Sequence, residues 1–136
     1  MVKLKICGLK RLEDIEIVNR HKPDFIGFVF AESPRKVNHD LAEQLKDNLN
    51  SDIKAVGVFV DNPQEEIIEL FNRGIIDMAQ LHGSEDEEYI QSLKDKTNNK
   101  LKIINAIEIK DETDISQYDK SQADYLLFDS GKGSGK

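Results

Sequence analysis

Four side chains that can carry a proton or bind an anion each follow a short apolar run in the sequence. They are the Cys7 thiol, the Arg35 guanidinium, the His82 imidazole and the Asp129 carboxyl group. The runs before them are rich in Ile, Val and Phe, which is typical of buried strands. In parallel α/β barrels the catalytic groups lie at the C-terminal ends of several strands. The arrangement therefore favours an enzyme over a binding module.

The thiol of Cys7 is a candidate general base or nucleophile. An unperturbed cysteine has a pKa of about 8.5, so it needs positive surroundings to ionise near neutral pH. Lys5 lies on the same face of the same expected strand, where its ammonium group could supply part of that field. The alternative is that Cys7 is a small buried apolar residue, which is a common role for a lone cysteine.

Arg35 and His82 are candidates for holding a substrate. The guanidinium of Arg35, in the loop Ser33-Pro34-Arg35, suits bidentate binding of a carboxylate. The alternative is a solvated loop charge. The imidazole of His82 could orient a substrate or move a proton. The alternative there is a structural histidine held by hydrogen bonds.

Asp129 ends an otherwise apolar run, Tyr125–Phe128. A carboxyl group beside an apolar surface has a raised pKa and can serve as a general acid. The alternative is an aspartate that starts a turn. The sequence after it, residues 131–136, is rich in glycine, which favours a mobile loop or lid over a site. It lacks the spacing of a phosphate-binding P-loop.

Apolar runs alternate with segments of helical periodicity along the whole chain. Predicted helices lie between the strands, the last over Asp111–Tyr118, and the order β-α repeats five times before a sixth strand. Such alternation predicts a parallel sheet with right-handed crossovers in a single domain over residues 1–136. The predicted strands are Lys3–Cys7, Asp24–Phe30, Ile53–Val60, Asp77–Leu81, Leu101–Ile107 and Ala123–Phe128.

Two details of the helix ends are predicted from residue type. Asn62 should cap a helix whose first residue is Pro63. Gly74 should end the same helix.

Strand alternation predicts which side chains share a face. Leu4 and Ile6 should face the helices, which leaves the other face of the first strand for the barrel interior. The residues expected on interior faces are Lys3, Lys5 and Cys7, then Met78, Gln80 and His82, then Tyr125, Leu127 and Asp129.

Composition limits the classes of partner. The 136 residues carry a net charge of −7, which argues against non-specific nucleic-acid binding. The single cysteine excludes an intrachain disulfide and fits a reducing cytosol. The longest apolar run, Phe25–Ala31, is too short to cross a bilayer. The prediction is a soluble cytoplasmic protein with neither nucleic-acid nor membrane partners.

Taken together and in order, five stretches resemble phosphoribosylanthranilate isomerase, a family of tryptophan biosynthesis. The resemblance runs from Lys3 to the last residue. The stretches are Lys5-Ile6-Cys7-Gly8, Gly27-Phe28-Val29-Phe30, Ser33-Pro34-Arg35, Val56-Gly57-Val58-Phe59-Val60 and Gln80-Leu81-His82-Gly83-Ser84-Glu85.

The resemblance implies a (β/α)₈ TIM barrel and an aldose–ketose isomerase that needs no metal or cofactor. The implied reaction is the Amadori rearrangement of N-(5′-phosphoribosyl)anthranilate, a small phosphosugar substrate. It also implies that Asp129 is the general acid, that Cys7 is the general base and that Arg35 holds the anthranilate carboxylate. We expect His82, Gln80 and Lys5 to contribute to substrate binding.

The chain differs from the family in its number of strands. A full barrel has eight strands, whereas this pattern gives about six and therefore predicts an incomplete barrel. Exposed edge strands would then favour self-association or pairing with a complementing fragment. Two alternatives remain at this point: a non-catalytic partial barrel that needs a complementing segment, and a different phosphosugar enzyme on the same fold.

Overall fold

The computed structural model describes residues 4–83, 85–108 and 123–129 of the chain. Strands and helices alternate from the N-terminus as far as the fifth strand. The elements are β1 (Lys5–Cys7), α1 (Leu12–His21), β2 (Phe25–Val29), α2 (His39–Asp47), β3 (Lys54–Phe59), α3 (Gln64–Asn72), β4 (Met78–Leu81), α4 (Glu87–Lys96), β5 (Lys102–Glu108) and β6 (Tyr125–Asp129).

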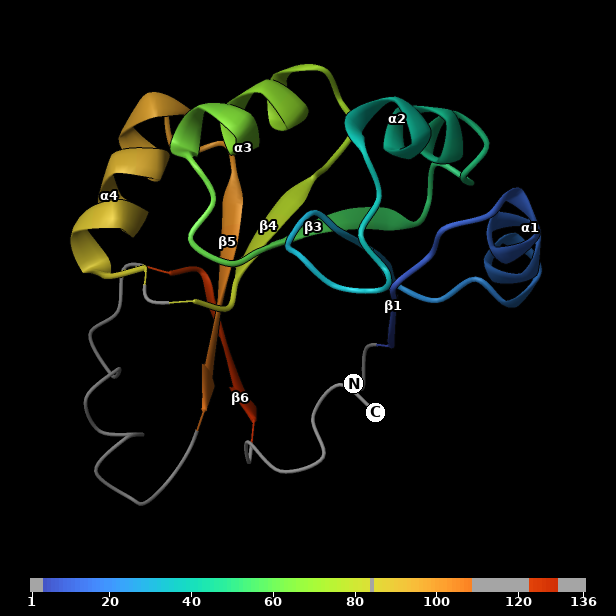
Figure 1. Cartoon of the computed structure of the whole chain (residues 1–136), viewed down its shortest axis with the longest axis horizontal. Helices are drawn as coiled ribbons and strands as arrows, with labels where there is room; N and C mark the ends of the chain where they lie inside the picture. The colour runs from blue at the N-terminus through green and yellow to red at the C-terminus, as the bar shows by residue number, and fades with distance from the viewer. Residues whose placement is uncertain (1–3, 84, 109–122, 130–136) are drawn as a thin grey trace.

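The described strands form one parallel sheet in the order β1-β2-β3-β4-β5-β6. This confirms the predicted sheet, and each strand lies within two residues of its predicted range. The sheet is curved, and α1 to α4 lie on its outer side (Figure 1). The predicted helix Asp111–Tyr118 and the glycine-rich residues 131–136 lie outside the described residues.

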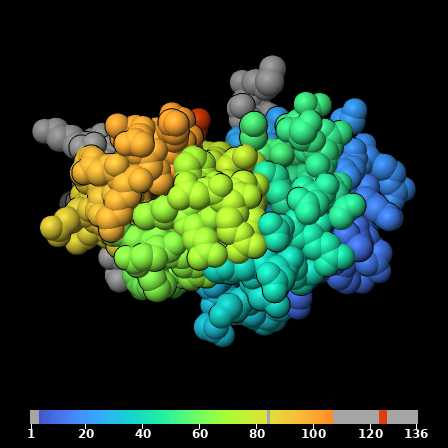
Figure 2. Space-filling view, turned by 90° about the horizontal axis from the view of Figure 1, so that it is seen from above, coloured from blue at the N-terminus to red at the C-terminus, as the bar shows by residue number. Residues whose placement is uncertain are grey.

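The outer faces of the strands pack against the helices. Ile26, Phe28 and Ile103 have no exposed surface. The rings of Phe30 and Phe59 stack with their centroids 5.4 Å apart. From above, the atoms of the helices and adjoining loops form one continuous cover from the blue N-terminal side to the orange α4 region (Figure 2). Burial of this apolar layer fixes which face of each strand remains for the interior.

One expectation about this face is wrong. Leu4 was expected to meet the helices with Ile6, but Leu4 is 57% exposed. Ile6 is partly buried and packs against the core. The reason is geometric: Ile6 reaches the core, whereas no helix among the described residues covers the start of β1.

The expectation about the start of α3 is also wrong. Pro63, not Asn62, occupies the N-cap of α3. The Asn62 side chain instead accepts a hydrogen bond from the Val60 N–H and donates one to Glu66. Gly74 lies just beyond the end of α3 with a positive φ of 76°, which confirms the predicted helix stop.

Candidate active site

The C-terminal ends of β1 to β4 border a pocket of about 350 Å³. Cys7, Arg35 and His82 all line it, although they are far apart in the sequence. The structure thus brings together three of the side chains selected from sequence, at the edge where parallel barrels keep their active sites. The other lining residues are Gly8, Val29, Ala31, Glu32, Ser33, Pro34, Val58 and Val60.

Cys7 is the last residue of β1, and its side chain is exposed and not in a disulfide. It pairs in register with Gly27 of β2. A Cβ atom at Gly27 would lie 2.7 Å from the Cys7 Sγ, closer than real Cβ contacts. Glycine at this position therefore leaves the space that the thiol occupies. Exposure also corrects the alternative of a buried, apolar cysteine.

Arg35 reaches back across the start of the loop after β1. A Cβ atom at Gly8 would lie 2.5 Å from the Arg35 Cδ, and Gly8 has a positive φ of 88°. The side chain thus packs on a position that suits only glycine. The Arg35 N–H donates to the Ser33 Oγ at 3.0 Å, and Lys10 Nζ donates to the Pro34 carbonyl at 2.8 Å. These contacts hold the guanidinium beside the end of β1.

His82 follows β4 directly, and its backbone N–H donates to the Phe59 carbonyl at 2.9 Å. This bond continues the β3–β4 ladder by one step and fixes where the side chain leaves the sheet. The imidazole is exposed at the pocket, since His82 is an exposed residue that lines it.

Glu85 does not line this pocket but binds the loops beside it, a role that the sequence motif alone did not assign. Its carboxylate accepts from the Asp61 N–H at 2.6 Å and from the Gly83 N–H at 2.8 Å. It therefore joins the loops after β3 and β4. Tyr89 donates its hydroxyl to the Asn62 carbonyl nearby. Burial, with the neighbouring Glu85 and Asp61 carboxylates, raises the pKa of Tyr89 to about 12.

Lys5 and Gln80 form a hydrogen-bonded pair on the interior face. Lys5 Nζ donates to Gln80 Oε1, and Gln80 is 6% exposed. Burial lowers the pKa of Lys5, and the proximity of Cys7 partly opposes that shift. The pair does not line the 350 Å³ pocket. Lys5 lies two residues before Cys7 on β1, and Gln80 lies two residues before His82 on β4. Their hydrogen bond therefore joins β1 to β4 close to both strand ends.

Asp129 is the last residue of β6 and pairs in register with Glu108. Its backbone therefore ends at the same edge of the sheet as Cys7. The description of the structure does not extend to its side chain, and its role stays a prediction.

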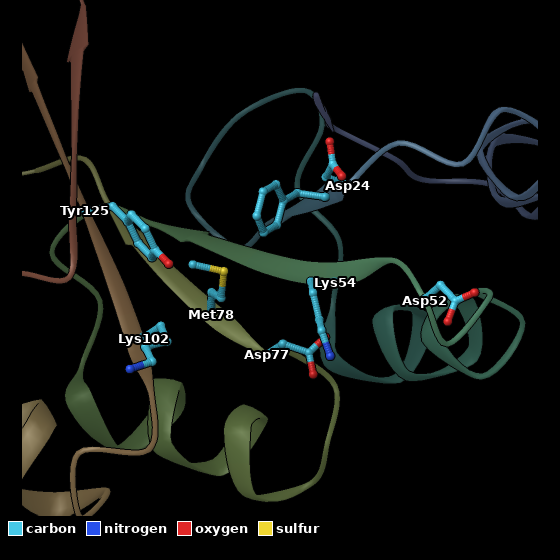
Figure 3. A pocket seen from close by; sticks show the side chains of 8 residues that line it. Asp24, Asp52, Lys54, Asp77, Met78, Lys102 and Tyr125 are labelled. Atoms are coloured by element: carbon cyan, nitrogen blue, oxygen red, sulfur yellow. The ribbon is translucent and has the colours of Figure 1, made fainter. Parts of the chain in front are cut away.

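A larger pocket, of about 510 Å³, lies at the opposite edge of the sheet. It is lined by residues at or near the starts of the strands, and the Tyr125 side chain points toward Met78 (Figure 3). In α/β barrels this N-terminal edge serves stability, and catalysis belongs to the other edge. Size alone does not make it the active site.

The described residues contain neither a cluster of metal ligands nor a membrane-spanning helix. No group of three His, Cys, Asp or Glu side chains within residues 4–83, 85–108 and 123–129 could hold a metal ion. Within the same ranges, no helix has the length and apolar character needed to cross a membrane.

Comparison with known proteins places these features in a family context. The family model for N-(5′-phosphoribosyl)anthranilate (PRA) isomerase matches residues 4–136. The chain is 43% identical over 136 residues to the N-(5′-phosphoribosyl)anthranilate isomerase of Clostridium acetobutylicum, and it covers 64% of that protein. It is 44% identical over 137 residues to the Clostridium kluyveri protein of the same name, and it covers 66% of that one.

Solved structures give the same result. The phosphoribosyl anthranilate isomerase of Thermus thermophilus superposes with a TM-score of 0.84 at 29% identity, over 99% of this chain and 66% of that one. A second isomerase, in complex with reduced 1-(o-carboxyphenylamino)-1-deoxyribulose 5-phosphate, gives a TM-score of 0.80 at 28% identity, over 95% of this chain and 65% of that one. The predicted fold, a TIM-barrel type that is incomplete with the six strands of the described residues, is confirmed.

The family model and the named relatives agree on one family, that of N-(5′-phosphoribosyl)anthranilate isomerase. The chain spans about two thirds of the length of the curated relatives that it matches, with 64% and 66% covered in the two cited above.

Proposed function

This chain belongs to the N-(5′-phosphoribosyl)anthranilate isomerase family, and we propose that its strand ends form part of the active site of such an isomerase. The reaction is the Amadori rearrangement of N-(5′-phosphoribosyl)anthranilate to 1-(2-carboxyphenylamino)-1-deoxyribulose 5-phosphate, in L-tryptophan biosynthesis. The observation that carries the proposal is the single pocket lined by Cys7, Arg35 and His82.

The proposed chemistry uses one acid and one base. Asp129 protonates the ribose ring oxygen, the bond from that oxygen to C1′ breaks, and a Schiff base forms between C1′ and the anthranilate nitrogen. The Cys7 thiolate then removes the proton from C2′ to give an enolamine. The enolamine tautomerises to the ketone, so the substrate and product are isomers. The exposed position of Cys7 at the end of β1 supports its role, because a base must reach the proton that it abstracts.

The other predicted residues bind or position. Arg35 holds the anthranilate carboxylate, which suits a guanidinium packed beside the pocket. His82 contacts the substrate from the end of β4. Lys5 and Gln80 act from the interior face of the sheet, where their hydrogen bond joins β1 to β4. The reaction as proposed requires no metal and no cofactor.

The substrate phosphate needs a further binding segment. In TIM barrels the phosphate site is often built by the loops after the seventh and eighth strands. The described residues form six strands and so contain no loop after a seventh or eighth strand. We propose that a segment equivalent to the remainder of the relatives supplies them. The cytosol is the proposed location, since one cysteine in a chain of 136 residues suits a reducing compartment.

The test is turnover with and without that segment. The part of the Clostridium acetobutylicum relative that this chain does not match is expressed separately and mixed with the chain, and loss of N-(5′-phosphoribosyl)anthranilate is followed. The mixture should be active, and each component alone should be far slower. A mixture that associates but does not convert substrate would refute the proposed function.

The matched control uses the same mixture with Cys7→Ser. Its activity should fall while association and secondary structure are retained. Equal activity of the two mixtures would remove Cys7 from the mechanism.

A further inference from the structure

The starts of the even-numbered strands share a local sequence pattern. An aspartate directly precedes each strand, and a large residue of largely apolar character begins it. The three pairs are Asp24-Phe25 at β2, Asp77-Met78 at β4 and Asp124-Tyr125 at β6. The register confirms that these positions are equivalent, because Phe25, Met78 and Tyr125 each pair with the corresponding residue of the preceding strand: Lys5, Val56 and Ile104.

Each aspartate carboxylate binds the backbone of the preceding strand. In each repeat the aspartate Oδ2 accepts a hydrogen bond at 2.8 Å from a backbone N–H. The donor lies one residue before the position where the two strands begin to pair. The donors are Leu4 for Asp24, Ala55 for Asp77 and Ile103 for Asp124. The unit of two strands therefore repeats three times in the described sheet.

In two of the three repeats a lysine completes the arrangement. Lys46 Nζ lies 3.3 Å from the Asp77 Oδ2, and Lys94 Nζ lies 2.7 Å from the Asp124 Oδ2. The lysine side chains are only 20% and 13% exposed, so these pairs are better shielded from solvent than ordinary surface ion pairs.

Both lysines come from equivalent places. Lys46 lies in the last turn of α2, which leads into β3, and Lys94 lies in the last turn of α4, which leads into β5. In each case an ion pair joins the helix before an odd-numbered strand to the aspartate that precedes the following even-numbered strand. The same pattern predicts that a helix leading into β1 forms an ion pair with Asp24.

The first repeat lacks both contacts that such a helix would make. Among the described residues, no Lys, Arg or His nitrogen lies within ion-pair distance of the Asp24 carboxylate. Figure 3 shows this carboxylate pointing away from Lys54 and Lys102. Leu4 is 57% exposed, whereas its equivalents Ala55 and Ile103 are fully buried under helices. No described helix lies between β6 and β1 (Figure 1).

We infer that Asp24 and Leu4 form a docking site for a helix that carries a Lys or Arg in its last turn, the helix that leads into β1 when the barrel is closed. The charge of Asp24 selects the basic residue, and Leu4 selects an apolar residue on the same helix. The inference rests on family membership and on the internal repeat. It does not require that the complex be catalytically active.

The experiment measures association. The probe is the separately expressed part of the Clostridium acetobutylicum relative that this chain does not match, and the dissociation constant is measured by titration calorimetry at low and high salt. Asp24→Asn keeps an acceptor for the Leu4 N–H but removes the charge. It should weaken binding by about tenfold at low salt, as expected for loss of a shielded ion pair, and by less at high salt.

Asp52→Asn is the matched control, because Asp52 is an exposed aspartate at the same edge that does not start a strand. It should leave the dissociation constant nearly unchanged. Leu4→Ala should weaken binding without weakening its salt dependence. Exchanging the Lys and Arg residues in the last turn of the probe's final helix for Gln should identify one whose effect is not additive with Asp24→Asn.

Three results would overturn the inference. The first is an equal effect of Asp24→Asn and Asp52→Asn on the dissociation constant and on its salt dependence. The second is failure of the unsubstituted chain to bind the probe. The third is a concentration-dependent dimer of the chain alone that Asp24→Asn abolishes, which would assign the surface to a second copy. All three are read from binding or solution mass, so they are independent of a failure of turnover.

Discussion

The two edges of the sheet are built from different chemistry. At the C-terminal edge, the strands end in side chains that point into a pocket and have few partners of their own, such as Cys7 and His82. At the N-terminal edge, charged side chains are paired with backbone N–H groups or with lysines, as in Asp77 and Asp124. The side chains proposed to react are left accessible, and the carboxylates that bind neighbouring strands are paired. Substitutions at the two edges should therefore change different measurements.

The largest expected effect is on catalysis at the C-terminal edge. Cys7→Ser should lower kcat in the complemented mixture by at least ~100-fold, since a general base, the role proposed for Cys7, typically contributes that much. The melting temperature should hardly change, because Cys7 is exposed and makes no disulfide. Steady-state kinetics and thermal unfolding of the same samples test both parts. A large loss of stability with unchanged kcat would reverse the comparison of the edges.

The next effect is on stability at the N-terminal edge. Asp77→Ala should lower the free energy of unfolding by about 2 kcal/mol, because it leaves the Ala55 N–H without its acceptor. Asp77→Asn is the control, since an amide oxygen can still accept that hydrogen bond. Urea unfolding followed by circular dichroism gives both values. If the two variants are equally destabilised, the charge interaction with Lys46 matters more than the hydrogen bond.

A smaller effect, on both stability and the reactivity of Cys7, is expected at Gly27. Gly27→Ala places a Cβ 2.7 Å from the Cys7 Sγ. We expect a cost of roughly 1 kcal/mol, the low end for overpacking, because the exposed thiol can move aside. The rate at which a thiol reagent modifies Cys7 should change in this variant. An unchanged rate and an unchanged stability would mean that Gly27 does not position the thiol.

The smallest expected effect is on the stability of the fold at acidic pH. Although burial raises the pKa of Asp124, its hydrogen bonds from Lys94 and the Ile103 N–H outweigh that effect and lower the pKa overall. A carboxylate with a depressed folded-state pKa stabilises the fold above its unfolded pKa of about 3.9, and that contribution is lost as pH falls through the folded value. Asp124→Asn should therefore show a shallower loss of stability below about pH 4 than the unsubstituted chain, measured by thermal unfolding in a pH series.

Much of the fold could be predicted from local pattern. The alternation of Ile- and Val-rich runs with helical spacing places every described strand, because burial on both faces requires such runs in a parallel sheet. Errors appear where an outcome depends on neighbours. Asn62 has the residue type of a helix cap, yet its side chain is used by Val60 and Glu66 instead. Leu4 has the parity of a core residue, but no helix in the described part of the chain covers it.

The candidate site was less accessible to sequence reasoning. Residue type suggested Cys7, Arg35 and His82, and only the curvature of the sheet brings them to one pocket. The link made by Glu85 between two loops carries no local signal beyond its place in a motif, because its partners are backbone N–H groups of distant residues.

The amino-acid sequence alone determined the order of the described elements and the inward faces of β1 and β4, since both follow from periodicity and side-chain alternation. Tertiary structure decided which strand ends share a pocket and which aspartates find a lysine. Those outcomes depend on the register between strands and on the helix that lies over each one. The contrast between Asp124, held by Lys94, and Asp24, at an edge that no described helix covers, is the clearest case.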